Sequence, residues 1–347
     1  MVGIVGIGTY VPSYRIKLSE ILKASNYPPP LMDVEKAVPS TDEDVVTMAA
    51  EAATNAVRHS GISPEKVEAV YVGTTSSPYA DRTVSTTIAA HIGVPSSATL
   101  MEFGGSARAG TSALLACMDL INAGRAKYGL VIGTDSLLGS PGSTLEFYSG
   151  AGAGAVMLGK ENAIAEIEGA TSSAYEFADR WRRSADAYER DSGDDRFARE
   201  YGYTKAVVEA ASGLIKKLGK TSKDFRYVVQ QMLPFGIDPS KGIDASKKVG
   251  FDMPNLMPGI TFNVFGETGA AYVLLGLAQV FEQAKPNERI MLLSYGAGCS
   301  DAISLKLLPT AEAKKNALFS IKNFQKSKET INYIQYAKLK GVISASP

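Results

Sequence analysis

The stretch FGGSARAGTSALLAC, from Phe103 to Cys117, decides the fold of this 347-residue chain. It starts with Gly and Ser, which permit a tight turn and a close backbone approach, and continues as an uncharged run rich in Ala and Leu. That run is too short to cross a membrane, so it predicts a helix buried in the protein core. The start of such a helix gathers free N–H groups and the positive end of the helix dipole, which together favour a reactive thiolate. Here the turn holds Ser106, Ala107 and Arg108, so the pattern predicts a nucleophile site that has no cysteine.

The composition limits the classes of protein to consider. Hydrophobic residues make up 45% and charged residues 21%, as in an ordinary globular protein, and the net charge is zero. A neutral chain gives no sign of nucleic-acid binding. The N-terminus lacks the basic region and cleavage site of a signal peptide, and no apolar run reaches about 18 residues. We therefore expect a cytoplasmic protein that binds neither nucleic acid nor a membrane.

The chain has two cysteines and two histidines. The small number of cysteines favours a reducing compartment without a disulfide framework, and because Cys117 and Cys299 form no CxxC pair we expect no cysteine-based metal site. We interpret Cys117 as a small core residue and Cys299 as a structural one. His59 and His91 lie near predicted helix ends, where favourable interaction with the helix dipole is a simpler interpretation than catalysis. No histidine follows His91, which restricts general-base chemistry.

An internal duplication organises the chain. The segment AVVEAASGLIKKLGKTSKDFRYVVQQM lies over EAATNAVRHSGISPEKVEAVYVGT without a gap, so that Gly219 falls on Gly61 and Val228 on Val70. Each half then follows the order helix, strand, buried helix, strand, which predicts a mostly parallel sheet covered by helices. The starts of the two buried helices, near Ala109 and Thr268, should meet at the centre. Four strand-end loops should surround them, around Thr75, Ser136, Gln231 and Ser294.

The duplication also divides the chain into four parts. These are an N-terminal half (1–170), a connecting insertion (171–203), a C-terminal half (204–310) and a C-terminal extension (311–347). The insertion is charged and carries the only Trp, so we expect it to cap a site or to line a partner surface. The basic cluster KSKETINYIQYAKLKG in the extension is typical of a solvated element.

The ordered segments resemble the archaeal HMG-CoA synthases of the thiolase superfamily along nearly the whole chain. The matching segments include MVGIVGIGTYVPSYRIKLSEI, AVYVGTTSSPYA, YGLVIGTDS, PGSTLEFYSGAGAGAVMLG, RWRR and SYGAGCSDA. The resemblance implies an α/β thiolase fold with duplicated βαβαβ halves in five layers, αβαβα. It also implies a homodimer and a pocket for coenzyme A or acyl-CoA, with no cofactor held covalently and no metal.

The family uses a Cys nucleophile, a Glu acid/base and a His that assists acetoacetyl-CoA. In this chain the resemblance puts Ala107 at the Cys position, Thr75 at the Glu position and Gln231 at the His position, so it implies that all three are lost. The family's oxyanion-supporting Asn corresponds to Asn263, although the surrounding segment FNVFGETG carries an extra residue.

Other side chains are candidates for the missing chemistry. The hydroxyl of Ser106 lies beside the predicted helix start, but it needs a neighbouring base, for which Glu267 and Glu146 are the candidates. A carboxylate at Glu267 also suits a helix start for dipole reasons alone, and we favour that interpretation over acid/base work. The sequence does not indicate which residues bind the cofactor.

Relatives with this pattern include the synthase-like subunit of phloroglucinol acetyltransferase complexes, which lacks the Cys and carries Gln at the His position. There a thiolase performs the chemistry and a small OB-fold protein bridges the subunits. We therefore expect a non-catalytic, structural subunit of an acyltransferase complex, inactive without a thiolase and an OB-fold protein. The alternative is an active HMG-CoA synthase or condensing acyltransferase that uses Ser106, Glu267 or an unforeseen group. A further alternative is a sensor that binds CoA or acyl-CoA.

Overall fold

A nine-stranded sheet organises the computed structural model, which describes residues 1–30, 32–233, 242–315 and 320–343. Its strands lie in the order β11-β12-β13-β8-β1-β7-β6-β4-β5. Their bounds are Gly3–Tyr10 for β1, Ala69–Gly73 for β4, Thr99–Phe103 for β5, Tyr128–Ser136 for β6, Ala151–Gly159 for β7, Ala165–Ala174 for β8, Tyr227–Gln230 for β11, Arg289–Gly296 for β12 and Cys299–Leu307 for β13. The N-terminal half supplies β1 and β4–β7, and the later strands continue the sheet beyond β1.

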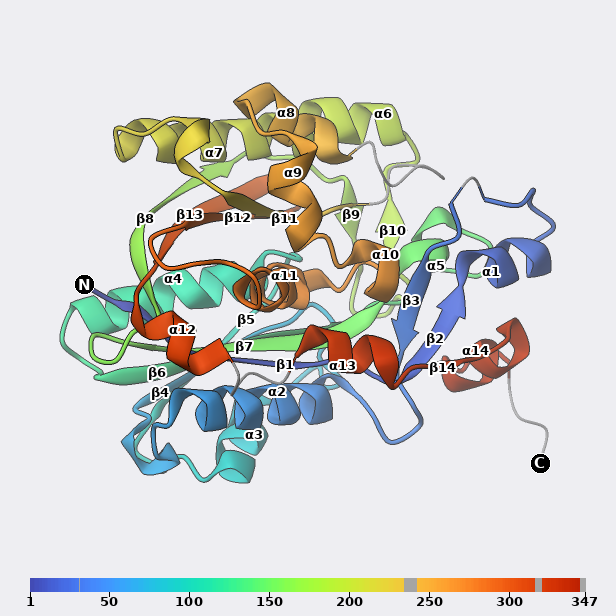
Figure 1. Ribbon diagram of the computed structural model, residues 1–347. Coiled ribbons are helices and arrows are strands. Elements are labelled where there is room, and N and C mark those ends of the chain that lie inside the picture. The colour runs from blue at the N-terminus through green and yellow to red at the C-terminus, as the bar shows by residue number, and fades with distance from the viewer. Residues whose placement is uncertain (31, 234–241, 316–319, 344–347) are drawn as a thin grey trace.

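Three layers of helices separate and cover the two parts of the sheet (Figure 1). Helices α7 (Lys205–Lys217) and α8 (Asp244–Val249) cover one outer face, and α2 (Val45–Ser60) and α3 (Ser85–Ile92) cover the other. Between the two parts lie α4 (Ala109–Asn122) and α11 (Tyr272–Phe281), whose inner faces are almost wholly buried. The expected five-layer αβαβα arrangement is thereby confirmed.

The structure also confirms the order of elements in the two halves. The series α2, β4, α4, β6 in the first half is repeated by α7, β11, α11, β12 in the second. The aligned glycines have the same role, because Gly61 caps α2 at a φ of 71° and Gly219 follows α7 at a φ of 62°. Glycine adopts this left-handed backbone without the steric cost of a Cβ, which explains why both positions carry it.

The prediction of a mostly parallel sheet is wrong. Strands β4, β5 and β6 are parallel, as are β11 and β12, but β1–β7, β6–β7, β12–β13 and β13–β8 are antiparallel. The β12–β13 connection shows the reason. Only Ala297 (φ 50°) and Gly298 (φ 75°) join these strands, and a two-residue turn with positive φ at both positions makes a hairpin, never a crossover.

The remaining elements lie around this core. A three-stranded sheet is formed by β2 (Tyr14–Lys17), β3 (Glu35–Val38) and β14 (Glu329–Thr330), and a two-stranded hairpin by β9 (Arg180–Trp181) and β10 (Arg190–Asp191). The other helices are α1 (Leu18–Ala24), α5 (Thr144–Tyr148), α6 (Asp195–Phe197), α9 (Met253–Leu256), α10 (Phe262–Phe265), α12 (Thr310–Lys314), α13 (Ile321–Lys326), α14 (Tyr333–Leu339), the π-helix Ala198–Thr204, and the short 3-10 turns Pro64–Lys66, Ser222–Asp224, Met257–Gly259 and Gly269–Ala271. Within the described ranges, no helix is long and apolar enough to span a bilayer.

The C-terminal extension is packed against the body, contrary to the expectation of a solvated element. Helix α14 buries Tyr336 completely, and the hydroxyl of Tyr336 accepts a hydrogen bond of 3.0 Å from the ammonium of the buried Lys36. The Lys340 ammonium donates to the hydroxyl of Ser136 at 3.0 Å. The extension therefore reaches the loop that follows β6, close to the strand ends where a site was expected.

Candidate active site

A pocket of about 190 Å³ lies at the carboxyl ends of β4, β11 and β12, beside the starts of α4 and α11. Its walls come from the loop before α4, the segment before α11, the β9–β10 hairpin with its flanking residues, and the ends of β4, β11 and β12. The lining residues are Thr75, Gly105, Ser106, Ala107, Asp179, Arg180, Trp181, Arg182, Glu189, Leu233, Glu267, Tyr295, Gly296 and Ala297.

Glycines allow the two central helix starts to come together below this pocket. A Cβ added at Gly110 would lie 2.2 Å from the carbonyl oxygen of Ala270, and one at Gly133 would lie 2.1 Å from the same atom. Both separations are far below contact distance, so a side chain at either glycine would force α4, β6 and the start of α11 apart. The predicted meeting of the buried helix starts is thus confirmed.

Asp135, at the end of β6, ties the two halves together from below. Its Oδ1 accepts hydrogen bonds from the hydroxyls of Thr74, Thr75 and Ser76, and its Oδ2 accepts one of 2.8 Å from the backbone N–H of Ala270. Burial raises the pKa of Asp135, while these donors oppose the rise. The carboxylate therefore fixes the Thr75 loop relative to the start of α11.

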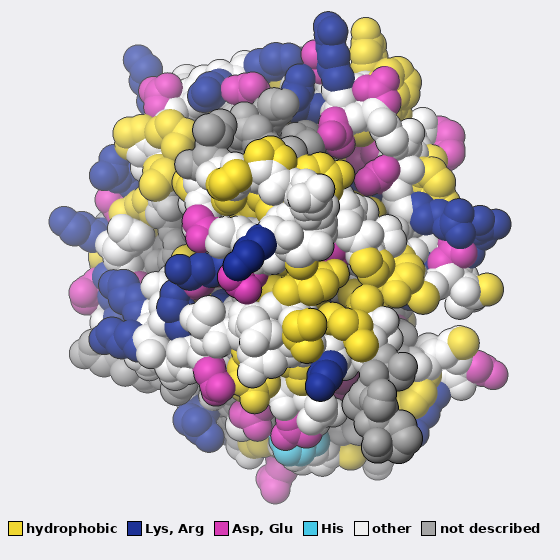
Figure 2. All heavy atoms as spheres, turned by 90° about the vertical axis from the view of Figure 1, so that its right-hand side faces the viewer, with side chains coloured by type: hydrophobic (Ala, Val, Ile, Leu, Met, Phe, Trp, Pro, Cys, Tyr) yellow, Lys and Arg dark blue, Asp and Glu magenta, His cyan; other side chains and the backbone are white. Residues whose placement is uncertain are grey.

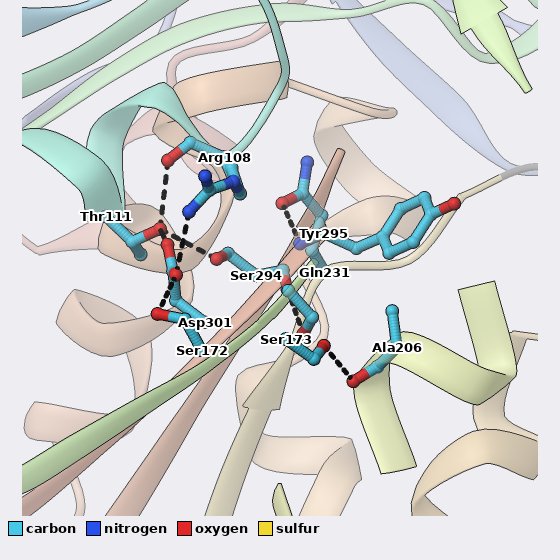
Figure 3. Close-up of polar contacts among 10 residues, drawn as sticks. Arg108, Thr111, Ser172, Ser173, Ala206, Gln231, Ser294, Tyr295 and Asp301 are labelled. Carbon is cyan, nitrogen blue, oxygen red and sulfur yellow. Dashed lines mark hydrogen bonds and ion pairs between the residues drawn. The ribbon is translucent and has the colours of Figure 1, made fainter. Parts of the chain in front are cut away.

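Asp301, in the C-terminal half, also connects the two halves through its carboxylate (Figure 3). It is wholly buried and accepts from the Arg108 guanidinium at 2.8 Å, from the Thr111 hydroxyl at 2.6 Å and from the Ser172 hydroxyl at 2.7 Å. Because Arg108 and Thr111 belong to the first turn of α4, this carboxylate holds the turn that carries Ala107.

The β9–β10 hairpin, which belongs to the charged insertion, contributes residues to the pocket wall. The Arg182 guanidinium donates to the carbonyl of Thr75 at 3.3 Å, which ties the hairpin to the loop after β4. Asp186 forms ion pairs with Arg183 at 3.3 Å and with Arg190 at 2.9 Å, and these connect the two sides of the hairpin. Figure 2 shows the side of the molecule on which this hairpin lies, with basic side chains gathered near the middle of the face beside a few acidic ones.

Glu267 is a buried carboxylate with three donors. Its Oε1 accepts from the backbone N–H of Gly269 at 2.8 Å and from the Gln231 amide at 3.3 Å, and its Oε2 lies 3.5 Å from the Arg180 guanidinium. Burial raises the pKa of Glu267, and Arg180 is the strongest opposing influence. The residue is held at both ends of its backbone, because its N–H donates to Tyr148 and its carbonyl accepts from Gly150.

Glu189, immediately before β10, is the second pocket carboxyl. Its backbone N–H donates to the carbonyl of Leu138 at 3.0 Å, and it forms an isolated parallel bridge with Gly139. Its Oε2 atom is buried and accepts no hydrogen bond from any residue that the structure describes. Burial raises the pKa of Glu189 to about 7, with Arg180 as the main opposing influence and Glu267 adding to the rise.

The pocket wall contains backbone N–H groups that have no acceptor among the described residues, and those of Ala107 and Ala297 are two of them. They belong to adjacent loops, since a Cβ added at Gly296 would lie 2.7 Å from the nitrogen of Ala107. Ala297 holds a left-handed φ of 50°, an uncommon conformation for a residue with a side chain. Paired free N–H groups beside a helix start are the usual means of holding an oxygen on which negative charge develops.

The three positions that the resemblance singled out come together. Thr75 and Ala107 both line the pocket, and Gln231 lies behind its wall. The Gln231 amide is fully used, because its NH₂ donates to Glu267 and Gly269 and its oxygen accepts from the Tyr295 N–H at 3.1 Å (Figure 3). Its bonds show that Gln231 holds Glu267 in place.

The other candidates lie in different places. Ser106 and Glu267 line the pocket, but Glu146 does not: it accepts from Tyr333 and from the N–H of Gly142. Asn263 lies on α10 and is not among the lining residues.

Both cysteines also lie outside the pocket wall. Burial raises the pKa of the Cys117 thiol to about 12, which suits the interpretation of this residue as part of the core. Cys299, at the start of β13, is half-buried.

Arg180 and Glu189 were missed by the sequence reasoning. Both lie in the insertion that the charge pattern marked as a possible cap, but nothing in that pattern shows which of its charges turn inward. The hairpin register supplies this information by pairing Asp191 with Arg180 and Arg190 with Trp181. In the described part of the chain, no cluster of three or more His, Cys, Asp or Glu is arranged to hold a metal ion.

The family and structure comparisons agree with the fold on the structural class of the protein. Residues 36–161 match the family model of the thiolase N-terminal domain. The chain superimposes with a TM-score of 0.84 at 19% identity on MvaS in complex with 3-hydroxy-3-methylglutaryl coenzyme A, covering 100% of this chain and 93% of that one. It also superimposes with a TM-score of 0.76 at 19% identity on 3-oxoacyl-[acyl-carrier-protein] synthase III from Aquifex aeolicus, covering 88% and 100%. This is a thiolase-fold protein.

Two full-length relatives narrow the assignment. The chain is 37% identical to the hydroxymethylglutaryl-CoA synthase of Methanothermobacter thermautotrophicus, over 98% of this chain and 99% of the relative. It is 39% identical to the protein of the same name in Methanosarcina acetivorans, over 99% of each chain. The chain belongs to the hydroxymethylglutaryl-CoA synthase family.

These relatives overturn the expectation of a non-catalytic structural subunit. Proteins named as synthases are 35–39% identical over nearly the whole chain, which favours the alternative of an active enzyme. The earlier interpretation treated Thr75, Ala107 and Gln231 as evidence of an emptied site. The pocket is not empty of reactive groups, because Arg180, Glu189 and Glu267 supply charged side chains to it.

Proposed function

We propose that this protein is a condensing enzyme of the HMG-CoA synthase class. It joins the α-carbon of one acyl-CoA thioester to the carbonyl carbon of a second, and acetyl-CoA and acetoacetyl-CoA are the pair that the family resemblance implies. One observation carries the proposal: a single pocket combines the unpaired N–H groups of Ala107 and Ala297 with the carboxyls of Glu189, which is half-buried, and Glu267, which is buried.

The N–H groups would receive the carbonyl oxygen of the acetyl thioester. Hydrogen bonds to that oxygen make the α C–H more acidic, because the electrons left by the proton move onto the oxygen as an enolate. A carboxylate takes the proton, and the enolate carbon then attacks the ketone carbon of acetoacetyl-CoA. A carbon–carbon bond forms, and the ketone π-electrons become an alkoxide that is protonated to the hydroxyl. Water cleaves one thioester, which releases HMG-CoA and CoA.

This route uses no acyl-enzyme at position 107. The methyl group of Ala107 has no lone pair with which to attack a thioester. Ser106 is the adjacent hydroxyl, but it makes no hydrogen bond to a base within the described part of the chain. The acetyl group therefore stays on CoA until the carbon–carbon bond has formed.

Coenzyme A thioesters are the proposed ligands. Two solved structures of the same fold are described as complexes with 3-hydroxy-3-methylglutaryl coenzyme A and with CoA, which supports this class of ligand. The basic hairpin at the pocket mouth, with Arg182, Arg183 and Arg190, suits an anionic ligand. Calorimetric titration of the purified chain with CoA tests this part, and an absence of heat at millimolar CoA would contradict it.

The decisive experiment is turnover by the purified chain alone. Incubation with acetyl-CoA and acetoacetyl-CoA should yield HMG-CoA and free CoA, identified by mass spectrometry. Reactions without either thioester are the controls. The Glu176→Gln variant, altered at an exposed position outside the pocket wall, should be as active as the unaltered chain. Complete absence of product from the purified chain would contradict the proposal.

Three other expectations stay predictions. They are a homodimer, association with a thiolase and a small OB-fold protein, and a cytoplasmic location. Size-exclusion chromatography with light scattering tests the dimer, and co-purification with a co-expressed thiolase tests the association.

A further inference from the structure

Glu189 differs from every other acidic residue of the pocket in how little of its charge is compensated. Glu267 has three donors, from Gly269, Gln231 and Arg180. Asp179 accepts from the Tyr295 hydroxyl at 2.7 Å and from the backbone N–H of Arg180 at 2.9 Å. By contrast, the Oε2 atom of Glu189 is buried at the pocket wall and accepts no hydrogen bond from any described residue. A buried polar atom without a partner is costly and calls for an explanation.

The backbone around Glu189 is fixed, so the unsatisfied carboxyl is not a consequence of a loose loop. The hydrogen bond from its N–H to Leu138 and the bridge to Gly139 attach it to the loop after β6. The pairing of Arg190 with Trp181 fixes the next residue across the hairpin. The backbone of Glu189 is held by hydrogen bonds, and its Oε2 has no hydrogen-bond partner at the pocket wall. Such a carboxyl is suited to exchange a proton with a bound molecule.

Charges from every side determine the proton affinity of this carboxyl. Arg180 and Arg182 on the hairpin favour its anionic form, whereas Glu267 before α11 and Asp135 on β6 disfavour it. Burial outweighs the two arginines, and the pKa of Glu189 rises to about 7. A group of this kind is populated in both protonation states at neutral pH, which is the condition under which one carboxyl can both accept and return a proton.

We propose that Glu189 is the catalytic residue that moves the proton during condensation, an assignment that rests on the proposed function. Its Oε2 removes a proton from the α-carbon of the acyl thioester: the C–H bond breaks, an O–H bond forms on Glu189, and the C–H electron pair becomes the enolate. After the carbon–carbon bond has formed, the same O–H gives its proton to the alkoxide, which restores the carboxylate. Glu267, whose Oε2 lies 3.5 Å from the Arg180 guanidinium, acts as a positioning residue that holds Arg180.

The test separates proton removal from condensation. Purified protein is incubated with acetyl-CoA alone in D₂O, and deuterium entering the methyl group is followed by NMR. HMG-CoA formation is measured separately with both thioesters. The unaltered chain, Glu189→Gln, Glu189→Asp and the surface control Glu176→Gln are compared, and unchanged circular dichroism establishes that each is folded.

We expect Glu189→Gln to lower both deuterium exchange and condensation by about a hundredfold or more, with Glu189→Asp intermediate and Glu176→Gln unchanged. The pH profile of kcat should show a group near 7 in the unaltered chain, and this group should be absent from the residual rate of Glu189→Gln. A merely structural role would lower the rate without removing that group.

The outcomes distinguish the two proposals. Exchange that needs Glu189, without any HMG-CoA formed, would support the role of Glu189 and overturn the proposed function. Condensation that survives in Glu189→Gln with an unchanged pH profile would overturn the role of Glu189 and keep the proposed function. Absence of both exchange and condensation in the unaltered chain would overturn both.

Discussion

The carboxylate of Asp135 accepts a hydrogen bond of 2.8 Å from the backbone N–H of Ala270, although the residues lie 135 positions apart. Asp135 is the next-to-last residue of β6 in the first half, and Ala270 lies in the turn that leads into α11 in the second. The same turn presents its carbonyl to Gly110 and Gly133. The N–H of Ala270 is thus hydrogen-bonded to the opposite half and its carbonyl oxygen is packed closely against it, so the pocket geometry depends on the contact between the halves.

Replacing Gly110 by Ala should therefore destabilise the protein. The added methyl group would lie 2.2 Å from the carbonyl oxygen of Ala270, and backbone on both sides leaves little room for adjustment. We expect a loss of about 3 kcal/mol in the free energy of unfolding, measured by urea titration. The matched control is Gly213→Ala on α7, where the new Cβ would lie 3.9 Å from its nearest neighbours. The control should gain about 0.5–1 kcal/mol, because Ala favours a helix over Gly. An equal effect of the two changes would contradict the argument.

Glu267→Gln should abolish most activity while leaving the chain folded. The amide keeps the shape of the side chain but removes the carboxylate, and its NH₂ group must face a donor in either orientation: Arg180 on one side, or Gly269 and Gln231 on the other. A hydrogen bond to a charged group contributes about 1.5–3 kcal/mol. Losing one at this site should lower kcat/KM by about tenfold to a hundredfold and should also lower the melting temperature. Glu176→Gln is again the surface control. Full activity in Glu267→Gln would show that this carboxylate holds nothing that the reaction needs.

Ser106→Ala should retain activity within about threefold, since an unassisted serine hydroxyl is a weak nucleophile. Ser106 lines the pocket, and Ala keeps its Cβ and removes only the hydroxyl oxygen, so the change adds no atom to the pocket wall. Intact-protein mass spectrometry after incubation with acetyl-CoA should show no added acetyl group. An acetyl adduct on the unaltered chain that disappears in Ser106→Ala, together with lost activity, would establish a serine acyl-enzyme instead.

The sequence was sufficient for the architecture because the duplication carries physical signals that recur. Gly61 and Gly219 end equivalent helices with the same left-handed backbone, and Val70 and Val228 lie in equivalent buried strands. The sheet direction was mispredicted because helix–strand alternation does not reveal the returning strands. The decisive signal was the short AG segment at Ala297, which leaves no room for a crossover.

The site was only partly predictable. Thr75, Ala107 and Gln231 could be brought together because each follows a strand end or opens a helix within the repeated unit. Arg180 and Glu189 belong to the insertion, which has no counterpart in the other half, so no internal comparison could show that they turn toward the pocket. The inference of inactivity followed from counting lost groups at three positions, and it had no access to charges contributed by a distant hairpin.

His59 should make the stability of the fold depend on pH. Its Nδ1 accepts the backbone N–H of Ile7 at 2.8 Å, which fixes the proton on Nε2, 2.9 Å from the carbonyl of Lys314. The ring is buried, and this burial is the main cause that lowers the pKa of His59 below its ordinary value of 6.5. Below pH 6.5 the unfolded chain binds a proton that the folded chain resists, so stability falls as pH falls, by up to about 1.4 kcal/mol per pH unit until the folded group titrates.

The measurement is the urea midpoint at pH 7.5 and at pH 5.5 for the unaltered chain and for His59→Asn. The Asn oxygen can still accept from Ile7, but it cannot take up a proton in this range. We expect His59→Asn to be less stable at pH 7.5, because the contact with Lys314 is lost, and to lose less stability on acidification. His91→Asn, at an exposed position on α3, controls for the loss of a histidine in general and should follow the unaltered chain at both pH values. Because other groups titrate equally in all three proteins, the difference in pH dependence isolates His59. An identical fall in stability for His59→Asn and the unaltered chain would place the acid sensitivity elsewhere.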